Sequence, residues 1–221
     1  FISKECSIDK EPELLEDLQR AIDICPVEIP DDFNFAITKR KAIYKNYDSE
    51  YPHCPAIDIE YCVKCGDCEK LFKYVDLSQK EKNIRIHIGA VIMASGFDPY
   101  EPPQGLYAYK DSDHVITLPQ FKRLLEINND TLIYKGKEVN DLAFIYCVGS
   151  RNPADGNAYC SRYCCSSAIH AANHAKKKFR SIENVHFTRG IRTYGKQELL
   201  YNDALENGDI FLQFDIGSEP E

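Results

Sequence analysis

The grouping of the ten cysteines restricts what this chain of 221 residues can fold into. Four of them fall within residues 141–179. That stretch begins with the apolar run Leu142–Val148, typical of a buried strand, and ends with the alanine-rich run Ser161–Phe179, typical of a helix. The cysteines lie where the two runs meet: Cys147, Cys160, Cys164 and Cys165. Strand, loop and helix in this order open a dinucleotide-binding fold, but cysteines stand where such folds carry a glycine-rich phosphate loop.

These four cysteines predict a metal centre. Cys160 and Cys164 are four residues apart, so one face of the helix is expected to present both. The helix N-terminus supplies free N–H groups and a positive potential, and both favour an anionic centre with thiolate ligands. Four soft thiolates fit an iron–sulfur cluster or a zinc ion. A group of buried free cysteines is the weaker alternative, because four stand at one junction.

A second group has the spacing Cys62-x-x-Cys65-x-x-Cys68. In bacterial ferredoxins this triplet is followed by a cysteine–proline pair, and that fourth cysteine ligates the other cluster of the domain. Here no cysteine–proline pair follows the triplet. Cys25 is followed by proline, but no triplet precedes it. Crossed ligation therefore predicts one cluster, held by the triplet and Cys25, with the other cluster lost. Cys54, also followed by proline, is the rival fourth ligand, and zinc is the alternative to iron.

Charge and hydropathy exclude several classes of function. The net charge is −8 and the basic run Lys39–Lys41 is short, so nucleic-acid binding is not expected. No apolar run approaches the roughly 20 residues that a membrane span needs, and no signal peptide is visible. The close cysteine spacings suit ligands better than disulfides. We therefore expect a cytoplasmic protein, from an anaerobe if the metal is iron, with a disulfide-bonded domain as an alternative.

The remaining pattern predicts an α/β protein. Residues 27–44 are expected to be loop-like. Further elements are expected as follows: a helix within residues 1–24, a buried strand over 84–99 that ends at Ser95 and Gly96, a short helix over 118–127, a turn or hairpin over 130–140, a strand over 184–188, a helix over 196–207 and a strand over 210–214. From Leu142 onward, alternating strands and helices imply a parallel sheet with right-handed crossovers.

Several of these stretches resemble the A subunit of heterodisulfide reductase. They are CPVEIPDDFNF, KRKAIY, IGAVIMASGFDPY, AFIYCVGSR, YCSRYCC and IRTYGK, and the resemblance runs from about residue 25 to 215, the middle part of the family's length. It implies a Rossmann-like, thioredoxin-reductase-like parallel-sheet domain plus a small, degenerate ferredoxin-like α+β domain. The implied division is a ferredoxin-like insertion over 1–80, a return strand of an FAD domain and a linker over 81–117, and a second dinucleotide-binding-like domain over 118–221.

The resemblance also implies cofactors. It places the set from Cys147 to Cys165 beside a flavin and gives the chain two [4Fe–4S] clusters. Ala94, Ser95 and Gly96 match a segment that contacts FAD, with serine in place of the usual threonine. His170 stands where members that bifurcate electrons carry a lysine near the flavin. The family's first FAD loop would lie before the first residue, so flavin binding is expected to need residues outside this chain.

The function implied by the resemblance is electron transfer. The chain is expected to be an oxidoreductase subunit, or a fragment of one, that relays electrons between FAD, iron–sulfur clusters and partner subunits. The expected partners resemble the B and C subunits of heterodisulfide reductase, hydrogenase or ferredoxin-type donors, and substrate chemistry would occur on them. The alternative is a zinc-stabilised interaction module that docks a redox complex without carrying electrons.

Overall fold

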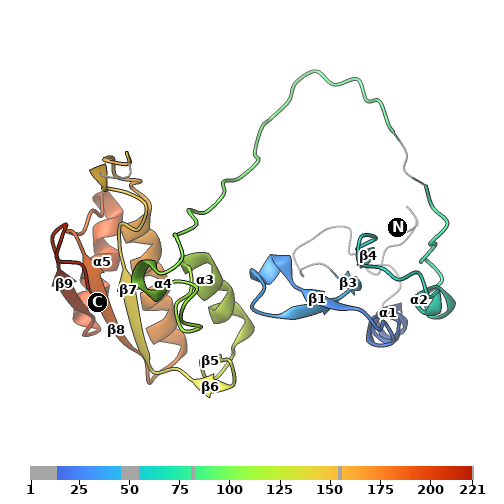
Figure 1. The fold of residues 1–221 in the computed structure, drawn as a ribbon, viewed down its shortest axis with the longest axis horizontal. Helices are drawn as coiled ribbons and strands as arrows, with labels where there is room; N and C mark the ends of the chain where they lie inside the picture. Colours follow the sequence, from blue (N-terminus) through green and yellow to red (C-terminus); the bar gives the residue numbers. More distant parts are fainter. Residues whose placement is uncertain (1–13, 46–54, 81–82, 154–155, 221) are drawn as a thin grey trace. The chain divides into compact units, whose positions relative to one another are not determined.

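The structure is a computed structural model in which residues 14–45, 55–80, 83–153 and 156–220 are described. The chain divides into two compact units, residues 1–95 and 96–221, each drawn in Figure 1. Both units mix helices with strands, which confirms the α/β class in its coarse form. The assignment of each unit to a particular domain family stays a prediction.

Within the described residues, the first unit combines the α-helices α1 and α2 with two antiparallel strand pairs. Its elements in chain order are α1 (Leu14–Asp23), β1 (Glu28–Pro30), β2 (Lys39–Lys41), β3 (Ile43–Lys45), β4 (Pro55–Ile57) and α2 (Asp67–Leu71). β1 pairs with β2, and β3 pairs with β4. The loop-like expectation for residues 27–44 was therefore wrong in part. Asp31 accepts a hydrogen bond from the backbone N–H of Phe33 at 3.1 Å and starts the turn that brings β2 back onto β1.

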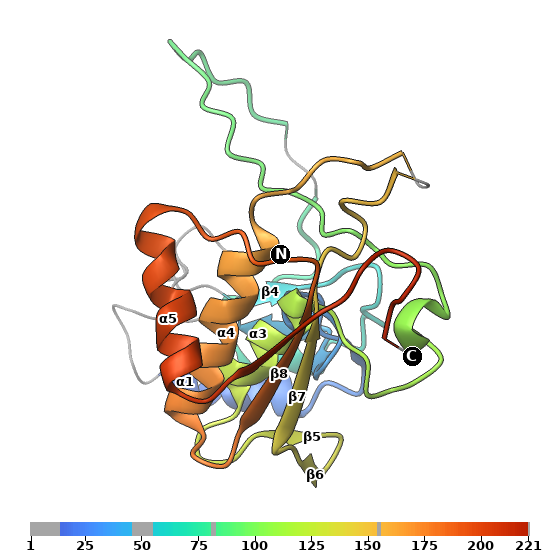
Figure 2. The ribbon, with the colours of Figure 1, turned by 90° about the vertical axis from the view of Figure 1, so that its left-hand side faces the viewer.

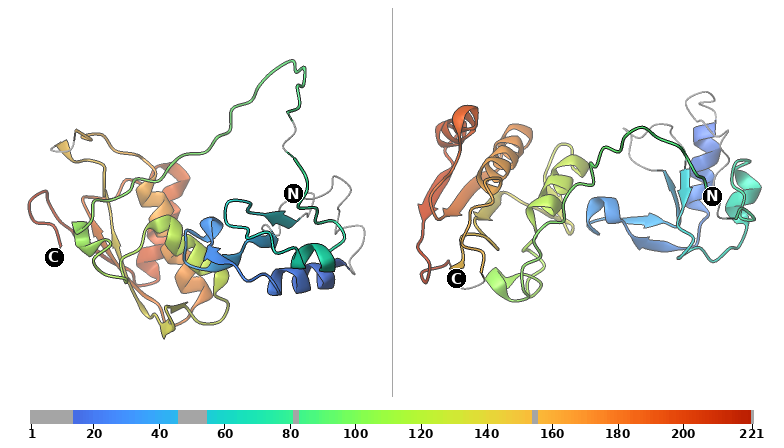
Figure 3. Two further views of the ribbon diagram at one scale, coloured as in Figure 1. Left: turned by 45° about the vertical axis from the view of Figure 1, so that its right-hand side comes forward. Right: turned by 90° about the horizontal axis from the view of Figure 1, so that it is seen from above.

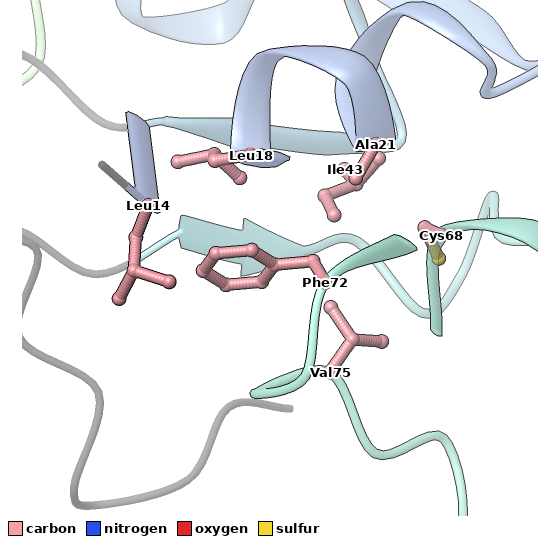
Figure 4. Packing of buried hydrophobic residues seen from close by; sticks show 7 residues of the cluster. All are labelled: Leu14, Leu18, Ala21, Ile43, Cys68, Phe72 and Val75. Atoms are coloured by element: carbon pink, nitrogen blue, oxygen red, sulfur yellow. The ribbon is translucent and has the colours of Figure 1, made fainter. Parts of the chain in front are cut away.

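The core of the first unit is small and lies under α1. Leu14, Leu18 and Ala21 are spaced four and three residues apart, so they share the buried face of this helix. Figure 4 shows Phe72 and Val75 beneath that face. Cys68 belongs to the same core and is 8% exposed. One predicted metal ligand is thus part of the packing that holds this unit together.

The second unit is built on a three-stranded sheet in the order β7-β8-β9. Its elements are α3 (Leu118–Ile127), β5 (Ile133–Tyr134), β6 (Lys137–Glu138), β7 (Asp141–Ile145), α4 (Cys164–Lys178), β8 (Glu183–Thr188), α5 (Glu198–Glu206) and β9 (Ile210–Gln213). All three strands of the sheet run parallel, as predicted. Figure 2 shows α4 and α5 side by side next to the sheet.

Local sequence explains the other elements of this unit. Thr117 and Gln120 form a reciprocal capping box at the start of α3, and Pro119 lies in its first turn. Phe121, Leu124 and Leu125 are buried on the inner face of that helix. The expected hairpin is also present, as the antiparallel pair β5 and β6.

The segment expected to form a buried strand, residues 84–99, is extended and exposed instead. Ile86 is 71% exposed and Ile92 is 91% exposed, and none of the described strands pairs with the segment. Figure 3 draws it as a plain trace without a strand arrow. The expectation of burial was wrong for this structure because a strand is buried only where another strand or a helix covers it.

No helix among the described residues has the length and apolar character needed to cross a bilayer.

Candidate metal centres

The first candidate site brings together the four cysteines that crossed ligation predicts. One small cavity in the first unit is lined by Cys25, Cys62, Cys65 and Cys68. Cys25 follows α1 and donates its backbone N–H to the carbonyl of Ile22 at 3.1 Å, whereas Cys68 lies on α2. Cys54, the rival fourth ligand, lies outside the described residues. Ligation by these four residues stays a prediction that this placement supports.

The loop around the triplet bends its backbone toward the sulfur atoms. Lys64 has a positive φ of 55° and donates its N–H to Cys62 Sγ at 3.4 Å. The start of the loop is tied down because Cys62 donates its N–H to the carbonyl of Asp58 at 3.0 Å. The carboxylate of Asp58 in turn accepts a hydrogen bond from Arg40 of β2 at 3.1 Å. N–H donors at sulfur are among the features that tune a thiolate-bound iron centre.

Burial and the neighbouring sulfur atoms both act on the thiol of Cys68. Burial raises the pKa of the Cys68 thiol, and the nearby sulfurs of Cys62, Cys65 and Cys25 raise it further. Each sulfur therefore lies close enough to disfavour negative charge on Cys68. A bound cation or cluster would relieve this repulsion, because it binds the deprotonated thiolates.

The second candidate site lies at the carboxyl end of β7. Cys147, Cys160, Cys164 and Cys165 line one cavity in the second unit. Cys147 follows β7 with a φ of 61°, a left-handed conformation that is strained for a residue with a side chain. Cys164 and Cys165 are the first two residues of α4. The structure thus brings the strand end and the helix start together, as the sequence predicts.

One detail of the prediction was wrong. Cys160 and Cys164 do not share a helical face, because α4 begins only at Cys164. Arg162 has a φ of 60°, which places it outside the right-handed helical region. In this conformation Arg162 donates its N–H to Cys160 Sγ at 3.4 Å. The turn parallels the one at Lys64, so both sites use a left-handed residue two positions after a cysteine.

Arginines distinguish the second site, and the sequence patterns did not single them out. Arg151 Nη1 donates to the carbonyl of Arg189 at 2.6 Å and lies 3.9 Å from Cys147 Sγ. Arg162 and Arg192 also line the cavity. Burial raises the pKa of the Cys147 thiol, whereas Arg151 and Arg189 act to lower it. The arginine after the Cys-Val-Gly-Ser sequence was the available signal, since it follows the cysteine by four residues.

A buried polar network anchors the strand end that carries Cys147. Tyr146 Oη lies 2.9 Å from His186 Nδ1, and His186 Nε2 lies 3.1 Å from the Asp209 carboxylate. Lys176 of α4 pairs with that carboxylate at 2.9 Å, and Asn184 donates to it. Burial alone would raise the pKa of Asp209, but the hydrogen bonds from His186, Lys176 and Asn184 lower it. The sequence signal for this network was an asparagine and a histidine two residues apart in β8, because alternate residues of a strand share one face.

The predicted flavin contacts are not gathered in one site. Ala94, Ser95 and Gly96 lie in the exposed extended segment, and His170 is exposed on α4. Residues just beyond Gly96 nevertheless pack beside the second cysteine site. The ring of Phe97 meets that of Tyr163 edge to face at 6.1 Å, next to Cys164.

Tyr100 makes the closest approach to the loop after β7. A methyl group placed on Gly149 would lie 2.5 Å from the Tyr100 ring, and Gly149 has a φ of 74°. Glycine is therefore required at this position for two reasons, the backbone conformation and the aromatic ring. Because Gly149 is two residues after Cys147, this contact places the chain that follows the predicted FAD segment against the second site.

The donor chemistry fits thiolate-bound metal at both sites. All eight described cysteines are free thiols in the structure. Within the described ranges no three Cys, His, Asp or Glu side chains converge on a position for a single metal ion. Four sulfurs around one cavity, with N–H groups directed at them, suit a soft metal or a cluster.

Comparison with known proteins relates the chain to A subunits of three archaeal reductases. It is 33% identical over 202 residues to that of the H(2):CoB-CoM heterodisulfide,ferredoxin reductase of Methanothermobacter thermautotrophicus, a match that covers 86% of the chain and 31% of that protein. It is 32% identical to the iron-sulfur A subunit of the CoB--CoM heterodisulfide reductase of Methanocaldococcus jannaschii, over 91% of the chain and 33% of that protein. For the A subunit of the Ferredoxin:CoB-CoM heterodisulfide reductase of Methanosarcina acetivorans the identity is 31%, over 86% of the chain and 29% of that protein.

The chain therefore spans about a third of the length of the relatives it matches. No protein-family model matches it.

Proposed function

The chain is homologous to the A subunit of heterodisulfide reductase over most of its own length, and from this premise we propose that it carries electrons through two [4Fe–4S] clusters. The first cluster is held by Cys25, Cys62, Cys65 and Cys68, and the second by Cys147, Cys160, Cys164 and Cys165. The observation that carries the proposal is that each set of four cysteines lines a single cavity. A cluster at each site would accept and release one electron at a time.

The residues of the chain have two tasks in this function. The thiolates bind the metal, and the N–H groups of Lys64 and Arg162 partly neutralise the charge on the sulfurs they face. Burial of Cys68, Cys147 and Cys165 keeps water away from one side of each site. The protein therefore sets the position and the reduction potential of each cluster, and the chemical reaction of the substrate takes place outside this chain.

We further propose that FAD and partner subunits complete the electron path. Ala94, Ser95, Gly96 and His170 are the proposed flavin contacts, but an exposed segment and an exposed histidine do not enclose a flavin. Flavin binding would need further residues around them. The proposed partners are proteins like the B and C subunits of heterodisulfide reductase, a hydrogenase or a ferredoxin-type donor. The support for partners of this kind is that the relatives are named as A subunits of reductases that act on heterodisulfide and ferredoxin.

Metal analysis tests this function directly. The chain, purified without oxygen, is expected to be brown and to contain about eight iron and eight sulfide per polypeptide, as two [4Fe–4S] clusters require. A colourless protein with about two zinc ions per polypeptide and no sulfide would instead support the zinc-stabilised interaction module. Flavin content measured on the same sample tests the FAD proposal separately.

A further inference from the structure

The two cysteine sites differ in the charges that face them. Three arginines line the cavity of the second site: Arg151, Arg162 and Arg192. The cavity of the first site, as far as the described residues show it, is lined by the four cysteines, apolar side chains and Gly66. Lys70 lies outside that lining and interacts electrostatically with Cys65. Its charge is compensated by Asp67, which pairs with it at 2.9 Å and also interacts with Cys65. The described lining of the first site therefore holds no uncompensated positive charge.

Arg151 is held in place by a reciprocal contact between two loops. Its Nη1 donates to the carbonyl of Arg189 at 2.6 Å, and Arg189 Nη1 donates to the carbonyl of Arg151 at 3.1 Å. The carboxylate of Glu219 pairs with Arg189 at 3.3 Å, and the side chain of Arg189 is only 10% exposed. The loops that follow β7 and β8 are thus tied together, and the guanidinium of Arg151 stays 3.9 Å from Cys147 Sγ.

This arrangement has an electrostatic consequence for electron binding. A [4Fe–4S] centre with four thiolate ligands is anionic, and reduction adds one more negative charge. A fixed positive charge a few ångströms away stabilises the reduced form, whereas apolar surroundings disfavour it.

We propose that Arg151, positioned by Arg189, raises the reduction potential of the second site above that of the first. An electron shared between the two sites then resides on the second at equilibrium. With a cluster at each site, the one electron given up by the first site, which is oxidised, would be the electron taken up by the second site, which is reduced. No bond is made or broken, and a low-potential one-electron donor of the ferredoxin class refills the first site. This inference rests on the proposed function, because it requires a cluster at both sites.

The test is an anaerobic redox titration of the cluster-loaded chain, followed by electron paramagnetic resonance. Arg151→Gln removes the charge, Arg151→Lys keeps it without the guanidinium fork, and Arg180→Gln makes the same charge change at an exposed position beyond the far end of α4. We expect Arg151→Gln to lower the midpoint potential of the second site only, and Arg151→Lys to restore most of that loss. Arg180→Gln is expected to move neither potential, and the first site serves as an internal reference.

Three outcomes would overturn the inference: an unchanged potential in Arg151→Gln, an equal shift at both sites, or a wild-type protein whose first site has the higher potential. The wild-type order remains measurable even if Arg151→Gln fails to load, because Cys68→Ser and Cys165→Ser assign each signal to its site. Iron and sulfide are measured on every sample. A wild-type chain that binds neither would refute the proposed function itself, which separates that failure from failure of the inference.

Discussion

At the first site Cys68 belongs to the small hydrophobic core of its unit, whereas at the second site Cys147 and Cys165 pack into a core that is built on a parallel sheet. Cys68 packs with Phe72 and Val75, so the packing of the unit and the geometry of the site depend on the same residues. Cys147 instead follows a strand that is anchored by the Tyr146–His186–Asp209 network. The comparison teaches that one ligand chemistry can be supported in two ways. We expect metal to be needed for folding at the first site and only for function at the second.

The largest effect is expected from removing one ligand at each site. Cys68→Ser and Cys165→Ser should each lower the iron content by about half, since each removes one of two [4Fe–4S] clusters. Small domains with little core depend on bound metal for folding, so Cys68→Ser should also expose the backbone of the first unit to hydrogen exchange. Cys165→Ser should leave exchange in β7, β8 and β9 nearly unchanged. Equal loss of protection in both variants' two units would contradict the expectation that only the first unit needs metal for folding.

A core substitution sharpens the same contrast. Phe72 is fully buried in the first unit, and Phe72→Ala should cost about 4 kcal/mol through lost burial and the cavity it leaves. A loss of this size is a large part of the free energy of unfolding of a small unit, so the first unit should unfold at ambient temperature. The matched control is Phe33→Ala, because Phe33 is 46% exposed. Hydrogen exchange measured by peptide would show whether the second unit is unaffected, and simultaneous loss of both units would argue against independent folding.

The buried network of the second unit should tolerate substitution less well than its surface. Asp209→Asn leaves Lys176 facing a neutral amide in a buried setting, which should cost about 3 kcal/mol. Asp203→Asn, at an exposed position on α5, is the matched control and should change little. Thermal unfolding of the two variants at neutral pH measures the difference. Similar melting temperatures for both would show that the network is not a stabilising feature of this unit.

The same carboxylate predicts how the stability of the second unit depends on pH. The pKa of Asp209 is lowered from 3.8, so its ionised form stabilises the fold fully above the unfolded-state pKa. This stabilisation is lost as the pH falls below 3.8 through the lower folded-state pKa. Acid unfolding of the second unit should therefore shift to higher pH in Asp209→Asn. An unshifted acid transition would show that other carboxylates control it.

The smallest effects are expected at two glycines with positive φ, one beside each site. Gly66→Ala meets no atom within 4 Å, so it should cost only about 1 kcal/mol for the left-handed backbone. Gly149→Ala has the same backbone cost and must also displace the Tyr100 ring, so about 2 kcal/mol is expected. Denaturant unfolding of both variants compares them. Tyr100→Ala in the Gly149→Ala background should recover part of the loss, and no recovery would mean that the ring is not the obstacle.

The elements with a strong local signal could be predicted from the sequence. Cys164–Lys178 shows the alanine-rich pattern of a helix, and Leu118–Ile127 has its apolar residues at helical spacing. The parallel order of β7, β8 and β9 followed from alternating strands and helices. The short strands in residues 27–44 were missed because β1, β2 and β3 have three residues each, which is too few to show an alternating pattern, and each is defined by its pairing with another strand.

The thiolate ligand sets of this protein could be predicted without a structure, because the spacing of Cys62, Cys65 and Cys68 is short enough for one loop to present all three. The meeting of Cys147 with Cys164 and Cys165 could be predicted in the same way, since a strand and the following helix adjoin at the strand's carboxyl end. The folded chain was needed to place Cys25 beside the triplet and Arg151 beside Cys147. The physical reason is that charge and burial at a site come from residues distant in sequence, and no local pattern encodes which of them approach.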